Sequence, residues 1–170
     1  MTIDNIKIFQ DSGKVDIALV EAVEKKMAVL FPSSYKQFIC RHNNAYLTKQ
    51  YFEFFRPDRN EMGVSDIFFF GFGFEQELIT YSENIEGAQS YDAYGFEGLV
   101  TFASNSFGDY ICFDYRDISE PDQPKITFMS HDEFDDETDK MLTYHVAENF
   151  DEFCSLLYQE VFDDEAQYAS

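Results

Sequence analysis

Two alternating apolar runs around a short polar loop constrain this fold more than any other part of the sequence. The stretch reads GLVTFASNSFGDYICFDY and covers residues 98–115. Successive side chains of a strand point to opposite faces, so Val100 and Phe102 are expected on the same face. Gly108 can adopt the positive φ that the loop between the runs requires. The sequence therefore predicts an antiparallel hairpin in the middle of a sheet.

Helices are predicted at both ends of the chain, with strands between them. A helical stripe of apolar residues occupies 15–31 and ends at Pro32, and a shorter helix follows with Ser34 as its expected N-cap. The remaining expected elements are strand 51–55, polar loop 56–66, strand 67–74, a short helix at 76–90, strand 125–130, a solvated acidic loop at 131–139, and a helix at 149–162 capped by Asn149. This order predicts the α+β class, with a mostly antiparallel sheet covered on one face and flanked by N-terminal and C-terminal helices.

Length and composition favour one globular domain over residues 1–170. Its core is expected at about 15–162, between a short N-terminal lead and an acidic C-terminal tail. Hydrophobic residues make up 45% of the chain, including 20 Phe and 11 Tyr, which excludes a disordered chain. So many aromatic residues suit half-buried strands.

The cysteines and the N-terminus indicate a cytoplasmic protein. Cys40, Cys112 and Cys154 are widely spaced and lie in apolar runs, so we expect buried free thiols rather than a zinc or redox motif. The first residues lack the apolar core of a signal peptide, and no stretch approaches 18 apolar residues. We therefore expect no insertion into a membrane.

Charge is distributed unevenly along the chain, whose net charge is −21. Residues 1–59 contain nine Lys/Arg and seven Asp/Glu, whereas residues 60–170 contain three Lys/Arg and 26 Asp/Glu. Such a field repels nucleic acid and anionic membranes and attracts a basic partner. Solubility alone is the other explanation of this charge.

No motif that could carry catalysis is complete. Asp109 and Asp114 could act as paired carboxylates, but five positions along a strand place them on opposite faces. A glycine pair at residues 71 and 73 is flanked by acidic residues that would repel phosphate. His131 has no ordered set of further metal ligands nearby in the sequence. We therefore predict no enzyme, no catalytic residues, no metal and no cofactor.

An acidic run offers the strongest candidate for a binding surface. Six carboxylates within eight residues repel one another unless a basic partner relieves the repulsion. Phe128 and Phe134 could supply apolar anchors beside them. A solvated loop is the alternative. The predicted partner-contacting residues are Asp132, Glu133, Asp135, Asp136, Glu137 and Asp139, with Asp109 and Asp114 as weaker candidates.

Five stretches of the chain read, in order, LFPSSYKQFICRHN, FFFGFGF, LVTFASNSFGDYICFDY, KITFMSHDEF and NFDEFCSLL. Together they cover about residues 15–160. In this order they resemble the SUKH superfamily. The bacterial members of the superfamily are mostly immunity proteins, and a fungal relative regulates cell-wall synthesis.

The resemblance implies an α+β fold and neutralisation of a toxin, often a nuclease, by direct binding without catalysis. The resulting hypothesis is an immunity protein that occludes the active site of a basic nuclease toxin. A regulatory scaffold or peptide-binding module of the cell-wall regulator type is the alternative. An uncharacterised hydrolase is a third hypothesis, and it requires the carboxylates to converge in one pocket. The oligomeric state is open, because an exposed aromatic patch would support a homodimer.

Overall fold

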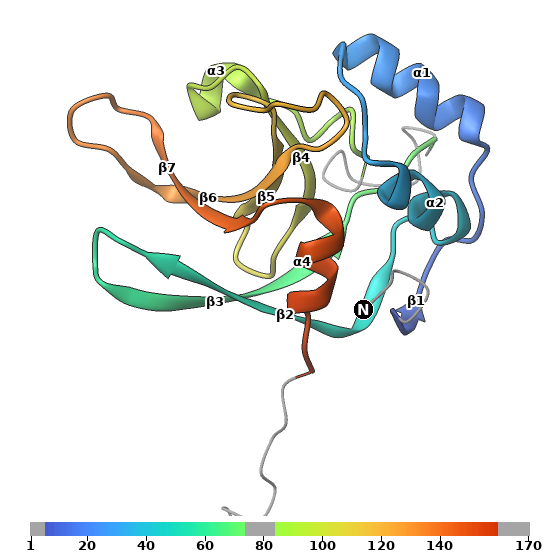
Figure 1. The fold of residues 1–170 in the computed structure, drawn as a ribbon, viewed down its shortest axis with the longest axis horizontal. Coiled ribbons are helices and arrows are strands. Elements are labelled where there is room, and N and C mark those ends of the chain that lie inside the picture. The colour runs from blue at the N-terminus through green and yellow to red at the C-terminus, as the bar shows by residue number, and fades with distance from the viewer. Residues whose placement is uncertain (1–5, 74–83, 160–170) are drawn as a thin grey trace, which may run out of the picture.

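The computed structural model describes residues 6–73 and 84–159 (Figure 1). Within these residues, short helices precede, interrupt and follow a run of antiparallel strands. In chain order the elements are β1 (Ile8–Gln10), α1 (Ile17–Met27), α2 (Ser33–Arg41), β2 (Tyr46–Arg56), β3 (Glu61–Phe69), α3 (Tyr91–Tyr94), β4 (Leu99–Ser104), β5 (Tyr110–Asp114), β6 (Lys125–Phe134), β7 (Met141–Ala147) and α4 (Phe150–Leu156).

One sheet contains all of these strands in sequence order, and each pairs antiparallel with the next. The sheet curls, so that β2 also contacts β7. The β2–β3 and β6–β7 hairpins project on the same side of the molecule, away from α1 and α2 (Figure 1). This arrangement confirms the predicted α+β class and the antiparallel sheet with flanking helices.

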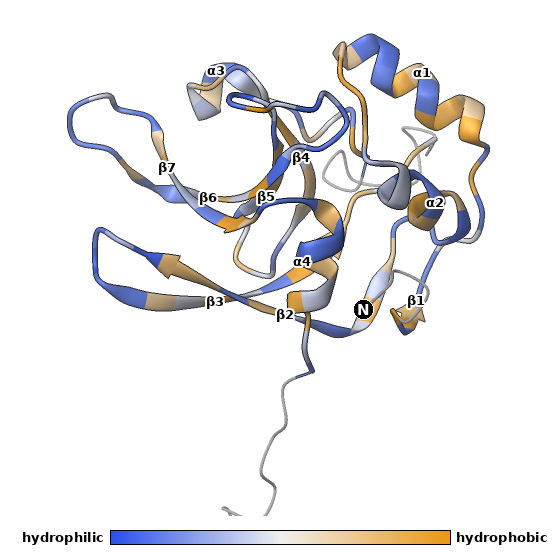
Figure 2. Ribbon diagram, in the orientation of Figure 1, coloured by the Kyte–Doolittle hydropathy of each residue, from blue (hydrophilic) through white to orange (hydrophobic). Residues whose placement is uncertain are grey.

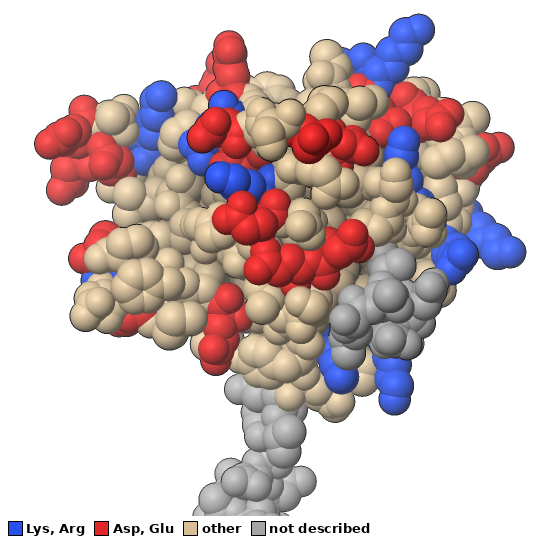
Figure 3. Space-filling model, in the orientation of Figure 1, with Lys and Arg blue, Asp and Glu red and all other residues tan. Residues whose placement is uncertain are grey.

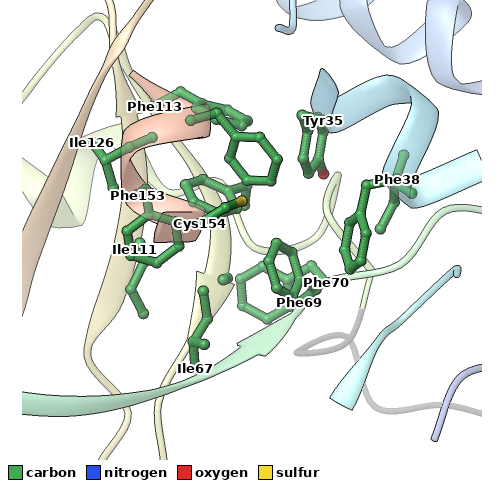
Figure 4. Close-up of a cluster of buried hydrophobic side chains, with 14 of the residues drawn as sticks. Tyr35, Phe38, Ile67, Phe69, Phe70, Ile111, Phe113, Ile126, Phe153 and Cys154 are labelled. Carbon is green, nitrogen blue, oxygen red and sulfur yellow. The ribbon is translucent and has the colours of Figure 1, made fainter. Parts of the chain in front are cut away.

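Aromatic side chains fill the space between the sheet and helices α2 and α4 (Figure 4). Phe102 of β4 stacks on Phe113 of β5, with ring centroids 4.1 Å apart. Tyr35 of α2 meets Phe113 edge-on at 4.9 Å and Phe150 of α4 at 5.4 Å. The aromatic residues counted in the sequence thus join both helices to the central hairpin.

A smaller cluster lies apart from this core. It joins Tyr94 of α3 to the central strands, and its other buried members are Leu99, Cys112, Met129 and Met141. The outer face of β4–β6 is therefore also partly covered, which the prediction of a sheet covered on one face missed. Cys112 and Cys154 are buried free thiols as predicted, whereas Cys40 is a free thiol that is only half-buried.

The central hairpin forms where it was predicted. Its loop includes Gly108, whose φ is +89°. A Cβ atom at this position would contact no other atom, so the positive φ, not a lack of space, is what favours glycine. A register shift between Thr101 and Ala103 interrupts the strict alternation of β4. Both faces of this strand are buried, so a bulge costs no exposure of apolar side chains.

Helix boundaries follow their capping residues. Pro32, not Ser34, occupies the cap position of α2, so the predicted Ser34 cap is wrong. Proline has no N–H and its ring fixes φ, here at −54°, which allows the helix to begin at Ser33. Asn149 caps α4 as predicted, because its side chain accepts a hydrogen bond of 2.8 Å from the Glu152 N–H. This helix ends at Leu156, and the end of the predicted helix, 160–162, lies outside the described residues.

Two segments predicted as loops are partly strand. The polar segment 56–66 contains the first six residues of β3, in which Met62 pairs with Phe55. The acidic segment 131–139 begins as strand, because β6 continues to Phe134, which pairs with Met141 of β7. Cross-strand pairing overrides the low strand propensity of these polar stretches. Strands β1 and β7 were not predicted.

The region between β3 and β4 also differs from the prediction. Strand β3 ends at Phe69, and Gly71 forms an isolated parallel bridge with Asn84. Residues 84–90 form turns rather than the predicted helix, and helix α3 begins only at Tyr91. Positions 74–83, which include the rest of that predicted helix, lie outside the described residues.

Candidate protein-binding surface

Charged and aromatic side chains join the two projecting hairpins. Glu133 of β6 accepts hydrogen bonds from Arg56 of β2, at 2.5 Å, and from Arg59 of the β2–β3 turn. Tyr144 of β7 accepts a 3.2 Å bond from Arg56 and donates one of 3.2 Å to Asp58. We call these five residues the hairpin link.

Electrostatics favours this link. The guanidinium of Arg56 also lies over the Tyr144 ring, 5.0 Å from its centroid, which is a cation–π geometry. The hydrogen bond to Glu133 raises the pKa of Arg56 well above its ordinary value, despite partial burial. Glu133 is one of the predicted partner-contacting residues, but its carboxylate forms ion pairs with Arg56 and Arg59 of the same chain.

The acidic turn, defined as residues 132–139, closes on the carboxylate of Asp135. That carboxylate accepts hydrogen bonds from the Thr138 N–H at 2.8 Å, the Thr138 hydroxyl at 2.9 Å and the Glu137 N–H at 3.1 Å. These bonds, that of the Thr138 amide first, lower the pKa of Asp135. Asp139 adopts a positive φ of 58° at the end of the turn. The fold thus holds the turn in a defined conformation.

The other carboxylates of the acidic turn face solvent. Asp136, Glu137 and Asp139 are exposed, and so is Asp132, which accepts a 3.0 Å hydrogen bond from the Ser130 hydroxyl. Figure 3 shows this concentration of acidic side chains at the tip of the β6–β7 hairpin, and Figure 2 shows that both hairpin tips are hydrophilic. These exposed acids can contact a partner without disturbing the fold.

Asp109 directly precedes β5 and connects the β4–β5 loop to β6. Its carboxylate accepts hydrogen bonds from the Asn105 amide at 2.9 Å, the His131 N–H at 3.0 Å and the His131 ring at 2.7 Å. Burial alone would raise the pKa of Asp109, but these hydrogen bonds outweigh it and the pKa lies below its usual value. The hydrogen bond between the His131 ring and the Asp109 carboxylate also raises the pKa of His131.

Asp114, at the end of β5, has a separate set of partners. Arg116 binds its carboxylate through the side chain at 2.8 and 2.9 Å, and Thr127 of β6 donates a 3.0 Å hydrogen bond. Burial would raise the pKa of Asp114, but Arg116 outweighs this effect and lowers it. Asp109 and Asp114 share none of these partners, so the two carboxylates do not work as a pair.

One group of side chains has the composition of a metal site. Asp109, His131 and Asp132 each offer a ligand atom, and these atoms lie within 4.8 Å of one another. The Nδ1 atom of His131 already bonds to the Asp109 carboxylate at 2.7 Å, so these two groups are partners within the cluster. We assign no metal to this cluster.

Two further surface features were missed in the sequence. Phe55, Met62 and Val64 form an exposed apolar row on the outer face of the β2–β3 hairpin. A second group of carboxylates surrounds the start of α4, at Glu148 and at residues 151 and 152 (Figure 3). The alternation of Met62 and Val64 with smaller residues was the signal for the first feature, but the polar residues before it suggested a loop.

One described hollow on the surface is mainly apolar. It has a volume of about 600 Å³ and lies between the end of α1 and the segment that follows β5, with Val29, Leu30 and Tyr115 in its lining. Glu24 also lines it, but its carboxylate accepts a 2.7 Å hydrogen bond from the Phe31 N–H and pairs with Lys36 at 3.2 Å. Glu21 also lines this hollow, whereas neither Asp109 nor Asp114 does.

The profile of the SMI1 / KNR4 family (SUKH-1) matches residues 14–155. The chain therefore belongs to this family, whose members are generally non-catalytic immunity or regulatory proteins. This confirms the resemblance found in the sequence.

No curated protein and no solved structure matches the chain closely enough to be compared. Over the described residues, no helix has the length and apolar character needed to cross a bilayer.

Proposed function

We propose that this chain is an immunity protein that binds and neutralises a cognate toxin, most simply a basic nuclease. Membership of a family that includes immunity proteins supports this proposal. The single observation that carries the choice of a basic partner is the acidic turn, in which Asp136, Glu137 and Asp139 face solvent. Like charges so close together repel one another, and a basic surface relieves that repulsion.

Inhibition then follows from occlusion. A nuclease binds the phosphate backbone through lysine and arginine side chains. Exposed carboxylates on a stable hairpin can occupy the same basic cleft, and the hairpin link holds that hairpin in place. Because the acidic field acts at a distance, it also raises the rate of encounter, and this rate falls as salt screens the charges.

Asp109 and Asp114 stay weaker candidates for contact in this proposal. Both carboxylates are partly buried and already hydrogen-bonded, so a partner would have to displace His131 or Arg116 to reach them. The exposed carboxylates of the acidic turn need no such rearrangement. We therefore assign the first contact to Asp132, Asp136, Glu137 and Asp139, while Asp135 closes the turn and Glu133 acts through the hairpin link.

Co-expression with the toxin domain encoded by the neighbouring reading frame tests this function. We expect cells that carry both proteins to survive, and cells that carry the toxin alone to die. If the chain were instead a regulatory protein of the same family, we would expect no toxin gene beside its own gene and no protection. Failure of the chain to protect against, or to bind, that toxin would contradict the proposal.

A charge-matched pair of variants tests the acidic turn. We expect Asp136→Lys, Glu137→Lys and Asp139→Lys together to weaken toxin binding by at least about tenfold. The control replaces Asp92, Glu97 and Glu120 with lysine, which changes the net charge equally at exposed sites elsewhere. Equal affinity of the two variants would remove the acidic turn from the interface, and an association rate that is independent of salt would refute electrostatic steering.

A further inference from the structure

Strand β3 has an edge that is only partly paired. Its ladder with β4 is short, with Phe68 opposite Ser104 and Phe69 opposite Ala103. Among the described residues, no strand pairs with Glu61–Val64 on the side away from β2. Alternate backbone N–H and C=O groups of an antiparallel strand point toward each edge, so this stretch can pair with another chain.

The β4–β5 loop marks where the open edge ends. The Asn105 amide donates a 3.0 Å hydrogen bond to the Ser65 hydroxyl, and the Ser106 N–H donates one of 3.1 Å to Asp66. The next loop residue, Phe107, has 79% of its surface exposed. The loop thus covers residues 65 and 66 of β3 and leaves the four residues before them open.

Apolar side chains accompany the open edge. Met62 is 56% exposed and Val64 58%, and Phe55 lies directly opposite Met62 on β2 with 47% exposed. Residues two apart on a strand share a face, so these three side chains form one row. Gly63 faces the other way, where the Phe54 ring leaves no room for a side chain. Exposed apolar side chains beside an unpaired edge are features that most proteins avoid unless a partner covers them.

Local charge indicates the chemistry of that partner. Glu53, opposite Val64, and Glu61 are exposed carboxylates beside the row. The arginines of this hairpin, Arg56 and Arg59, both bind Glu133 instead. A second copy of the chain would bring the same carboxylates and a net charge of −21, so self-pairing is disfavoured.

We propose that Glu61–Val64 of β3 is a docking edge for an extended segment of a basic protein partner, which adds to the sheet as a further strand. Main-chain hydrogen bonds to the edge hold the segment. Its apolar side chains cover Met62 and Val64, and its lysine or arginine side chains meet Glu53 and Glu61. This inference rests on the proposed function for the identity of the partner as the toxin.

Lysine substitutions test the edge in the full chain. We expect Met62→Lys together with Val64→Lys to weaken binding of the neighbouring toxin domain by at least about tenfold, because lysine on an edge strand opposes strand addition and repels a basic segment. The control is Ile17→Lys with Leu30→Lys, since both residues are exposed apolar positions on or beside α1. Equal loss of affinity in the two double variants would overturn the proposal. Circular dichroism of each variant confirms that it is folded.

Amide hydrogen exchange supplies a test that does not depend on the toxin. The probe is a nine-residue peptide of alternating lysine and valine, compared with the same peptide carrying N-methyl groups at alternate residues. We expect the first peptide to slow exchange of edge amides within 61–64, and the methylated peptide to leave it unchanged because it cannot form the ladder.

Each outcome decides a different point. If the toxin does not bind the wild-type chain but the peptide protects the edge, the proposed function fails and the docking edge stands. If the toxin binds without slowing exchange at 61–64, the function stands and the edge proposal is wrong. A wild-type dimer that Met62→Lys and Val64→Lys dissociate would assign the edge to a second copy and also overturn the proposal.

Discussion

The β2–β3 and β6–β7 hairpins are alike on the inside and different on the outside. Their inner faces meet through Phe54, which stacks on Phe128 at 4.3 Å and contacts Tyr144 at 5.7 Å. Outside, the first hairpin exposes an apolar row beside an open edge, whereas the second exposes the acidic turn. Packing dictates the inner faces, and it leaves the outer faces free to serve binding. The following changes test that division, beginning with the largest expected effect.

Removing the inner contact should destabilise the protein far more than removing its outer neighbour. Phe54→Ala empties a site that is 5% exposed and should lower the free energy of unfolding by about 3–5 kcal/mol. Phe55→Ala, one position along and 47% exposed, should cost less than about 1 kcal/mol. Urea unfolding followed by circular dichroism measures both variants. Similar losses would show that the two faces are not energetically distinct.

Cutting the hairpin link should have the next largest effect. Glu133→Gln leaves Arg56, whose side chain is 16% exposed, without its carboxylate and should cost about 1–3 kcal/mol of unfolding free energy. Glu137→Gln, on the exposed side of the same hairpin, should change stability by less than about 0.5 kcal/mol. If both substitutions prove neutral in urea unfolding, the hairpins are held by aromatic packing alone.

Two tyrosine hydroxyls should respond with opposite signs. The hydroxyl of Tyr144 has partners in the hairpin link, so Tyr144→Phe should lose about 1 kcal/mol of stability. The buried hydroxyl of Tyr35 has no hydrogen-bond partner among the described residues, so Tyr35→Phe should gain about 1 kcal/mol. Thermal unfolding of the two variants distinguishes the signs. A loss in Tyr35→Phe would indicate a partner for that hydroxyl.

The smallest effect should come from His131, and it should depend on pH. Its folded pKa is raised by Asp109, so its contribution to stability is complete below the unfolded pKa, near 6.5, and is lost as pH rises through the folded pKa. The free energy of unfolding of the wild type should therefore exceed that of His131→Gln by a few tenths of a kcal/mol at pH 5.5, and by less at pH 8.5. The effect is small because the pair is partly exposed. Urea unfolding at the two pH values measures this, and a difference that grows with pH would contradict it.

Sequence patterns located the parts of the fold in which local chemistry and tertiary structure agree. The central hairpin has both alternation and a glycine in its loop, and Asn149 is a cap that needs no tertiary partner. The first six residues of strand β3, Glu61–Asp66, were missed because polar residues surround Met62 and Val64 there, and their pairing with β2 is not encoded locally. Strand β7 was missed because it follows the acidic run and contains His145.

The candidate surface was only partly predictable for the same reason. Six adjacent carboxylates are visible in the sequence, but the pairing of Glu133 with Arg56 spans 77 positions. The open edge of β3 depends on where β4 stops pairing, and no residue pattern records that. The prediction that the acidic turn contacts a partner remains a prediction.

Contact between β2 and β7 also sets an order of events while the chain is being made. Arg56 ends β2, and β7 begins about 85 residues later, at Met141. At roughly 5–20 residues per second, a ribosome needs about 4–17 s to cover that distance. During this interval the aromatic inner face of the nascent β2–β3 hairpin has no cover from β7, and such transiently exposed apolar surface is prone to aggregation.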